Sequence, residues 1–166
     1  MSNKRIHHPI KGIVLCKESG EYLIDLILDS DINPVLLSSF VGALSLFGRD
    51  NLGKIEEISV TGLEIDMIIV VKYNLILIAI LAKEFAKNIE MLRSEIEKAL
   101  DIFYSSYQEE IAKAVDVSVF DDFKGILKMQ IEDYLEKIQD TEKEKEIGDF
   151  GFFTEAVKKS KDEEED

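Results

Sequence analysis

The sequence predicts an α+β domain with a five-stranded antiparallel sheet and the element order β-β-α-β-β-β-α-α. Short runs rich in β-branched residues come first as a pair and later as a group of three, with tight turns inside each group. Apolar residues at helical spacing fill the segment between these groups and the region after them. We find no internal repeat.

The first two strands are expected over residues 10–16 and 22–28. The polar, glycine-containing segment 18–21 between them has the character of a hairpin turn. Both faces of the second strand are mostly apolar, which is typical of a strand near the middle of a sheet. Asp25 is the exception.

A helix is expected next, from Pro34 to about Phe47. Asn33 can cap its free amides, Pro34 has a preset φ for the first helical position, and Gly48 is expected to end the helix in the left-handed conformation. Spacings of three and four predict one buried stripe. It consists of Leu36, Leu37, Phe40, Val41, Leu44 and Phe47.

The outer face of this helix carries no charge between Pro34 and Gly48, whereas solvated helices usually carry charges there. Either the two C-terminal helices cover this face, or it docks a partner or a second copy of the chain. We favour docking. The predicted protein interface consists of Ser39, Gly42, Ala43 and Leu46.

Three more strands are expected over residues 54–60, 63–72 and 75–81, as an antiparallel meander. The breaks between them, Thr61-Gly62 and Tyr73-Asn74, are short enough for tight turns. Alternation in the middle strand assigns one set of residues to the core face. This set is Leu63, Ile65, Met67, Ile69 and Val71.

After the meander, apolar residues recur at helical spacing. A long amphipathic helix is predicted over residues 85–115, and a second helix follows a weak capping-box-like start at Ser118 and Asp121. The second helix should bury a stripe of apolar residues, namely Phe120, Phe123, Leu127, Ile131, Tyr134 and Ile138.

The chain is expected to consist of a polar arm (1–9), a folded domain (10–138) and an acidic, mostly mobile tail (139–166). The aromatic residues Phe150, Phe152 and Phe153 are out of place in a solvated tail. We predict a docking motif here, which either folds back into a groove of its own domain or binds elsewhere.

Composition and charge argue against several classes of protein, namely nucleic-acid-binding, membrane-spanning and secreted proteins. A formal net charge of −14 with no basic patch disfavours nucleic acid as a partner. The longest apolar run, 75–82, is too short to span a membrane, and the polar start carries no recognisable signal peptide. One cysteine, Cys16, cannot form an internal disulfide, so a cytoplasmic location is expected.

No catalytic constellation is present, and neither an enzyme activity nor a cofactor is expected. Phosphate-loop motifs are absent, and the two histidines, His7 and His8, are adjacent in the polar arm, where they are poorly placed to share one metal ion. Cys16 is interpreted as a buried hydrophobic residue of a strand. A small hydrolase or a ligand-sensing domain stays an alternative without candidate residues.

The order of elements resembles the longin domains, in particular the free-standing longin-like proteins of archaea, over roughly residues 10–138. The resemblance is carried by the opening strand Ile10-Lys11-Gly12-Ile13-Val14, by Asn33-Pro34-Val35-Leu36-Leu37 at the helix start, and by the meander before paired helices. The roadblock fold is the nearest competitor, but it begins with an additional helix for which residues 1–9 are too short and polar. Profilin-like or GAF-like sheets would need different helix placement.

This resemblance implies a non-catalytic adaptor that docks proteins on the first helix and the neighbouring edge strand. Typical partners would be small GTPases or components of trafficking-like systems, and a homodimer is a further expectation. The alternative is a structural subunit of an obligate complex.

Overall fold

The computed structural model describes residues 9–83 and 89–140. The chain divides into two compact units between Gln130 and Ile131, and each is described by itself. In the second unit, the described stretch 131–140 is helical. All features discussed below belong to the first unit unless stated otherwise.

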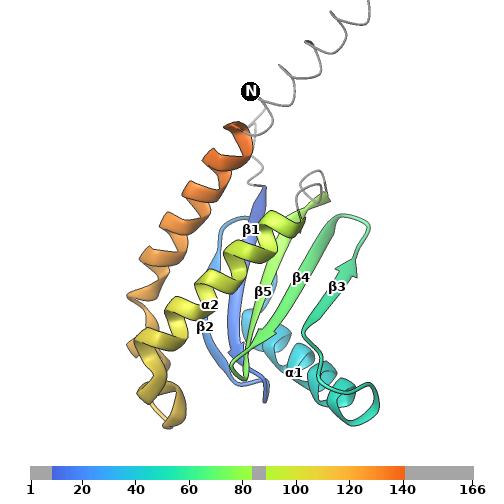
Figure 1. The fold of residues 1–166 in the computed structure, drawn as a ribbon, viewed down its shortest axis with the longest axis vertical. Helices are drawn as coiled ribbons and strands as arrows, with labels where there is room; N and C mark the ends of the chain where they lie inside the picture. Colours follow the sequence, from blue (N-terminus) through green and yellow to red (C-terminus); the bar gives the residue numbers. More distant parts are fainter. Residues whose placement is uncertain (1–8, 84–88, 141–166) are drawn as a thin grey trace, which may run out of the picture. The chain divides into compact units, whose positions relative to one another are not determined.

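The core of the first unit is a five-stranded antiparallel sheet with the strand order β2-β1-β5-β4-β3 (Figure 1). This confirms the predicted sheet. Its strands are β1 (Ile10–Lys17), β2 (Tyr22–Ile27), β3 (Glu57–Thr61), β4 (Ile65–Lys72) and β5 (Leu75–Ala82).

Strand β2 lies at an edge of the sheet, so the prediction that it occupies a position near the middle is wrong. Its apolar character has another cause. Leu23 and Ile24 are successive residues, which point to opposite faces of a strand, and both are buried. Contacts of β2 with the helix α1 and with residues 117–120 provide this cover at the edge.

The predicted tight turns of the β1–β2 and β4–β5 hairpins are confirmed. Gly20 has φ +94° in the β1–β2 turn, where its N–H donates to the Lys17 carbonyl at 2.8 Å. Tyr73 and Asn74 both have φ near +60° (57° and 59°), as the two-residue β4–β5 hairpin requires. The β3–β4 turn is longer than predicted, and Leu63 is 99% exposed rather than part of the core.

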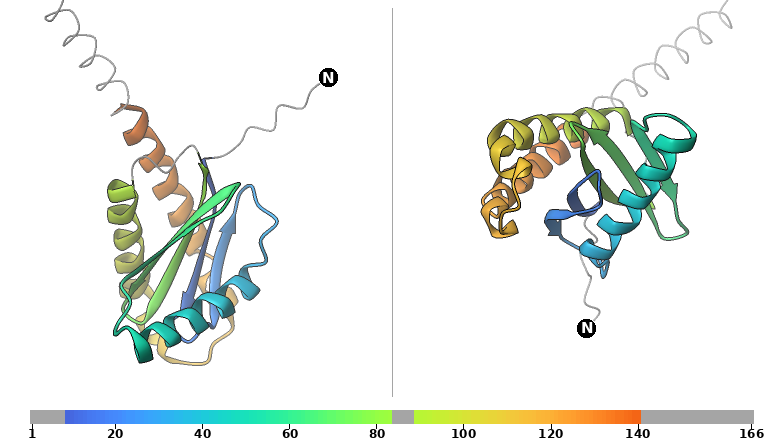
Figure 2. Two further views of the ribbon diagram at one scale, coloured as in Figure 1. Left: turned by 90° about the vertical axis from the view of Figure 1, so that its right-hand side faces the viewer. Right: turned by 90° about the horizontal axis from the view of Figure 1, so that it is seen from below.

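Two helices lie on opposite faces of the sheet (Figure 2). α1 (Pro34–Asn51) contacts β1 and β2, and α2 (Ile89–Ala112) contacts β4 and β5. Because α1 lies over the β1–β2 side, the same face is only partly covered over β3 and β4. The half-buried apolar residues there are Ile58, Val60, Ile65 and Met67.

The C-terminal region keeps the predicted helices with altered ends. Tyr107 leaves the helical conformation within α2 and packs its ring against Phe103, Phe120 and Phe123, at centroid distances of 5.1–6.1 Å. A 3-10 turn, η2 (Val117–Phe120), is capped by Asp116, not by Ser118 as predicted. In the first unit, residues 123–130 are helical, and Phe120, Phe123 and Leu127 of the predicted stripe are buried. In the second unit, the helical stretch 131–140 carries the other three stripe residues, Ile131, Tyr134 and Ile138, which are also buried.

The start of α1 follows the prediction and its end does not. The Asn33 Oδ1 atom accepts from the amides of Val35 and Leu36 at 3.0 and 3.1 Å. The helix continues past Gly48 to Asn51, and Gly48 is buried inside it. A Cβ at Gly48 would lie 1.8 Å from Cδ1 of Ile55, so this glycine makes room for a neighbouring side chain rather than ending the helix.

The buried face of α1 consists largely of small residues. It comprises Leu37, Ser38, Val41, Gly42, Ser45 and Gly48. The closest approach is at Gly42, where an added Cβ would lie 2.3 Å from the Cα atom of Gly20 in the β1–β2 turn. Glycine at 42 therefore allows the helix backbone to lie directly against the turn.

We predict that Gly42→Ala lowers the free energy of unfolding by about 1–3 kcal/mol, because the new methyl group meets backbone atoms that cannot rotate away. Gly125→Ala is the matched control, since it lies in a helix with open space around it. It should raise stability by about 0.5–1 kcal/mol through helix propensity. Urea unfolding measures both, and stabilisation by both substitutions would contradict the close contact.

Candidate protein-binding site on α1

Much of the stripe predicted to be buried on α1 is exposed. Leu36, Phe40 and Phe47 are 69%, 58% and 59% exposed, and Leu44 is half-buried. The prediction is wrong for these residues because small side chains face the sheet, and the large ones consequently point outward. Leu37 and Val41 are buried as predicted.

The outward-facing residues form a continuous feature. Leu36, Phe40, Ala43 and Phe47 follow one another at steps of four, three and four, so they line up along one face of the helix. We call these four residues the apolar ridge. Val35 and Leu46 are also exposed on the helix. Contiguous exposed apolar surface of this kind marks interaction sites on soluble domains.

An apolar groove lies beside the ridge at the start of α1. It has a volume of about 550 Å³ and is lined by Ile32, Asn33, Leu36, Leu37, Phe40 and Met67. Met67 on β4 is paired in the sheet with Val60 on the edge strand β3. The groove thus borders the half of the sheet that α1 leaves partly covered.

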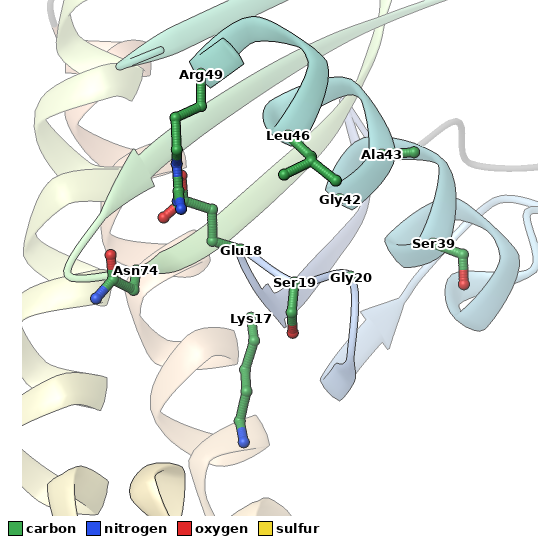
Figure 3. A pocket seen from close by; sticks show the side chains of 10 residues that line it. All are labelled: Lys17, Glu18, Ser19, Gly20, Ser39, Gly42, Ala43, Leu46, Arg49 and Asn74. Carbon is green, nitrogen blue, oxygen red and sulfur yellow. The ribbon is translucent and has the colours of Figure 1, made fainter. Parts of the chain in front are cut away.

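The four residues predicted as an interface line a second hollow, at the hairpin end of the sheet (Figure 3). Ser39, Ala43 and Leu46 are exposed, while Gly42 is buried against the β1–β2 turn. We call this hollow of about 740 Å³ the hairpin pocket. Its lining consists of Lys17, Glu18, Ser19, Gly20, Ser39, Gly42, Ala43, Leu46, Arg49 and Asn74.

Glu18 is the chemically distinct residue of the hairpin pocket. It is only 8% exposed, and its Oε1 atom pairs with Nη2 of Arg49 at 2.5 Å and accepts from Oγ of Ser45 at 3.2 Å. From the sequence, Glu18 was predicted only as part of the turn at residues 18–21. The available signal was Arg49, the one basic residue of the helix, which lies on the α1 face turned toward that hairpin.

The remaining candidates for chemistry are Cys16 and groups of metal-binding side chains. Cys16 is fully buried, and this burial raises the pKa of its thiol to about 11, so the thiol stays protonated at neutral pH. Within 9–83 and 89–140, no three histidine, cysteine or carboxylate side chains are grouped to hold a metal ion. No helix in these ranges is long and apolar enough to span a membrane.

The tail motif of Phe150, Phe152 and Phe153 lies outside the described residues, as do His7 and His8. Docking of this motif stays a prediction. The bounds of the folded domain stay a prediction too.

No protein-family model matches the chain, and no curated protein matches it. Solved structures do match. MglB of Myxococcus xanthus is 15% identical with a TM-score of 0.51, over 60% of this chain and 84% of that chain. A Roadblock/LC7 domain from Streptomyces avermitilis is 15% identical with a TM-score of 0.40, over 46% and 69% of the two chains. The gliding protein MglB from Thermus thermophilus is 12% identical with a TM-score of 0.41, over 45% and 62%.

The likeness to the Myxococcus protein shows the fold. Roadblock and MglB structures are longin-like folds, so the predicted fold class is confirmed. The choice between a longin domain and the roadblock fold rested on the N-terminal arm, and residues 1–8 lie outside the described part. The assignment to the free-standing archaeal longin-like proteins stays a prediction.

We predict that Arg49→Met lowers the free energy of unfolding by about 1–2 kcal/mol, because it leaves the buried Glu18 carboxylate without its cation. The loss stays below that of a fully buried pair because Arg49 is half-exposed. Arg93→Met is the matched control, since its partners Glu57 and Glu97 remain partly solvated. It should cost under about 0.5 kcal/mol.

Urea unfolding of both variants checks this prediction. Adding Glu18→Gln to Arg49→Met should recover most of the loss, since the amide removes the uncompensated charge. Equal effects of Arg49→Met and Arg93→Met would show that the buried carboxylate does not depend on its arginine.

Proposed function

We propose that this chain is a non-catalytic protein-binding adaptor and that its partner docks on the apolar ridge of α1. The observation that carries this proposal is the exposure of three large apolar side chains, Leu36, Phe40 and Phe47, on a helix face without charge. Such a face costs free energy in water and is stabilised when a partner covers it. The hairpin pocket with Ser39, Ala43 and Leu46 extends the same surface toward the hairpin end.

The proposed partner class is a small GTPase or a component of a trafficking-like regulatory system. Support comes from the resemblance to longin domains, which implies docking of such proteins on the first helix. The net charge of −14 further favours a partner with a basic surface, through faster association and charge complementarity. The mechanism is recognition, in which apolar area supplies most of the affinity and polar residues at the rim set the orientation.

We predict that Leu36→Glu and Phe47→Glu each abolish capture of the partner from native lysate. The two substitutions place a charge at either end of the apolar ridge, where it must be desolvated on binding. Capture is carried out with a nonhydrolysable GTP analogue and in parallel with GDP, and bound proteins are identified by mass spectrometry. A small GTPase should be enriched in one of the two nucleotide states.

Met129→Glu is the matched control, because Met129 is 66% exposed but lies outside α1. All three variants should keep the unfolding free energy within about 0.5 kcal/mol, as expected for exposed positions. A partner retained by both α1 variants would refute docking on the ridge. A fixed subunit recovered equally in both nucleotide states would instead identify a structural component of a complex.

Self-association is a second candidate function, favoured by a specific observation. Strand β3 is an edge of the sheet, and on the sheet face that packs against α1, Val60 and Met67 are only half-buried. This partly covered area adjoins the groove and the ridge. A second copy of α1 would present the same apolar ridge to this groove. A two-fold axis would then bury both ridges in one self-complementary interface.

We predict that Phe40→Glu converts such a dimer to monomers, because Phe40 belongs to both the ridge and the groove. Light scattering after size-exclusion chromatography measures the mass across a range of protein concentrations. The unchanged chain should approach twice the monomer mass, and Met129→Glu should behave like it. A monomer mass of the unchanged chain at every concentration would exclude self-association.

A further inference from the structure

The apolar groove at the start of α1 suits aromatic side chains. Its volume of about 550 Å³ lies in the range of cavities that enclose small ligands, and its lining is apolar apart from Asn33. The side-chain oxygen of Asn33 already caps the helix, where it accepts from the amides of Val35 and Leu36. The groove therefore offers an occupant apolar contact and few hydrogen bonds.

Large apolar side chains of the groove are open to solvent. Leu36 and Phe40 are 69% and 58% exposed, and Met67 on β4 is half-buried. An open groove of this composition costs free energy in water until another apolar group covers it. Its chemistry thus favours an aromatic or aliphatic segment over a charged one.

The same chain carries such a segment beyond the described residues. Phe150, Phe152 and Phe153 lie within four positions, in a part of the sequence that is rich in acids and lysines from residue 139 onward. A docked aromatic side chain buries about 150–250 Å², which is a large contact for so short a motif. Three phenylalanines this close together are better matched to an apolar groove than to water.

The tether is long enough for the motif to return to the domain that carries it. The described chain ends at Asp140, ten positions before Phe150, and ten extended residues span up to about 33–36 Å. By comparison, a folded domain of about 120–130 residues has a radius of gyration of about 14 Å. A motif on such a tether has an effective concentration of about millimolar, so modest affinity is sufficient for docking.

The charges around the groove and around the motif are complementary. Asp31 is exposed and directly precedes Ile32, which lines the groove. Lys158, Lys159 and Lys161 follow the motif by five to eight positions. An exposed ion pair of this kind contributes little affinity, but it gives a docked segment a preferred direction.

We propose that the aromatic motif of Phe150, Phe152 and Phe153 docks in this groove of its own chain and thereby restricts access to the apolar ridge. Leu36 and Phe40 belong to both the groove and the ridge, so the motif and a partner compete for the same side chains. Binding of a partner then requires release of the tail. This regulatory part rests on the proposed protein-binding function, whereas the docking itself does not.

Paramagnetic relaxation in the full-length chain locates the motif. A nitroxide is attached to Thr154→Cys beside the motif, and Cys16 does not compete for the label because it is fully buried. We expect the amide signals of Leu36 and Met67 to broaden and that of Asn74, beyond the other end of β4, to stay sharp. A mixture of nitroxide-labelled chain with isotope-labelled chain that lacks the nitroxide should show no broadening, because docking occurs within one chain.

Variants of the labelled chain separate docking in the groove from other causes of broadening. Replacing the three phenylalanines of the motif by serine should abolish the broadening, since no aromatic group is left to enter the groove. Leu36→Glu should abolish it as well, because docking would have to desolvate the charge. Phe47→Glu is the matched control, since Phe47 is similarly exposed on the same ridge but does not line the groove. It should leave the broadening unchanged.

A synthetic peptide of residues 147–157 measures the strength of the contact. It should bind the full-length chain that carries the three serine substitutions, with a dissociation constant on the order of millimolar or tighter. It should bind the unchanged chain at least about twofold more weakly, because the tail of that chain already occupies the groove at a comparable effective concentration.

Broadening centred elsewhere, or none, would overturn docking in the groove, and broadening in the mixture of chains would overturn docking within one chain. Equal affinity of the peptide for the two chains would overturn the regulatory part. These measurements contain no partner protein, so their failure leaves the capture result standing. A docked motif with failed capture, both by the unchanged chain and by the serine variant, overturns the proposed function alone.

Discussion

The close approach of α1 to the β1–β2 turn, where Gly42 lies against Gly20, determines which side of the helix faces the sheet. Only small residues allow this approach, so Ser38, Gly42 and Ser45 are buried. Leu37 and Val41 share this buried side, and the other large apolar residues of α1 lie on the side away from the sheet. The exposed ridge of Leu36, Phe40, Ala43 and Phe47 is therefore a consequence of how the helix packs.

The same approach creates the electrostatic character of the hairpin end. Ser45 and Arg49 lie one turn apart on α1, and the short distance to the β1–β2 hairpin brings both to Glu18. The carboxylate is thereby removed from water and half satisfied. The protein thus has two adjoining surface features on α1, the exposed apolar ridge and a pocket whose lining includes the ion pair of Glu18 with Arg49.

Local signals in the sequence predicted the fold well. Asn33-Pro34 marks the start of α1 and Tyr73-Asn74 marks the β4–β5 hairpin because each depends on backbone geometry within a few residues. The apolar stripe of residues 120–138 was also predicted, since a helix with one clear apolar face has only one way to bury it.

The sequence did not predict which face of α1 is buried, because this depends on a contact between distant parts of the chain. A stripe of large apolar residues is normally the buried one, and here two stripes compete on one helix. The small residues Ser38, Gly42, Ser45 and Gly48, at steps of four, three and three, were the signal for the other solution. The predicted interface residues Ser39, Ala43 and Leu46 flank this small-residue face, and Gly42 belongs to it. The pairing of Glu18 with Arg49 spans 31 positions and follows only from the folded arrangement.

The central claim is that a protein covers the ridge of α1 under native conditions. Site-specific photo-crosslinking tests it most directly, with benzoylphenylalanine replacing Phe47 on the ridge and, in a parallel sample, Met129 outside α1. Irradiation in native lysate should give one defined adduct from position 47, identified as a partner or a second copy of this chain, and none from position 129. Absence of an adduct at position 47, or the same adducts from both positions, would contradict the claim that this face is a binding surface.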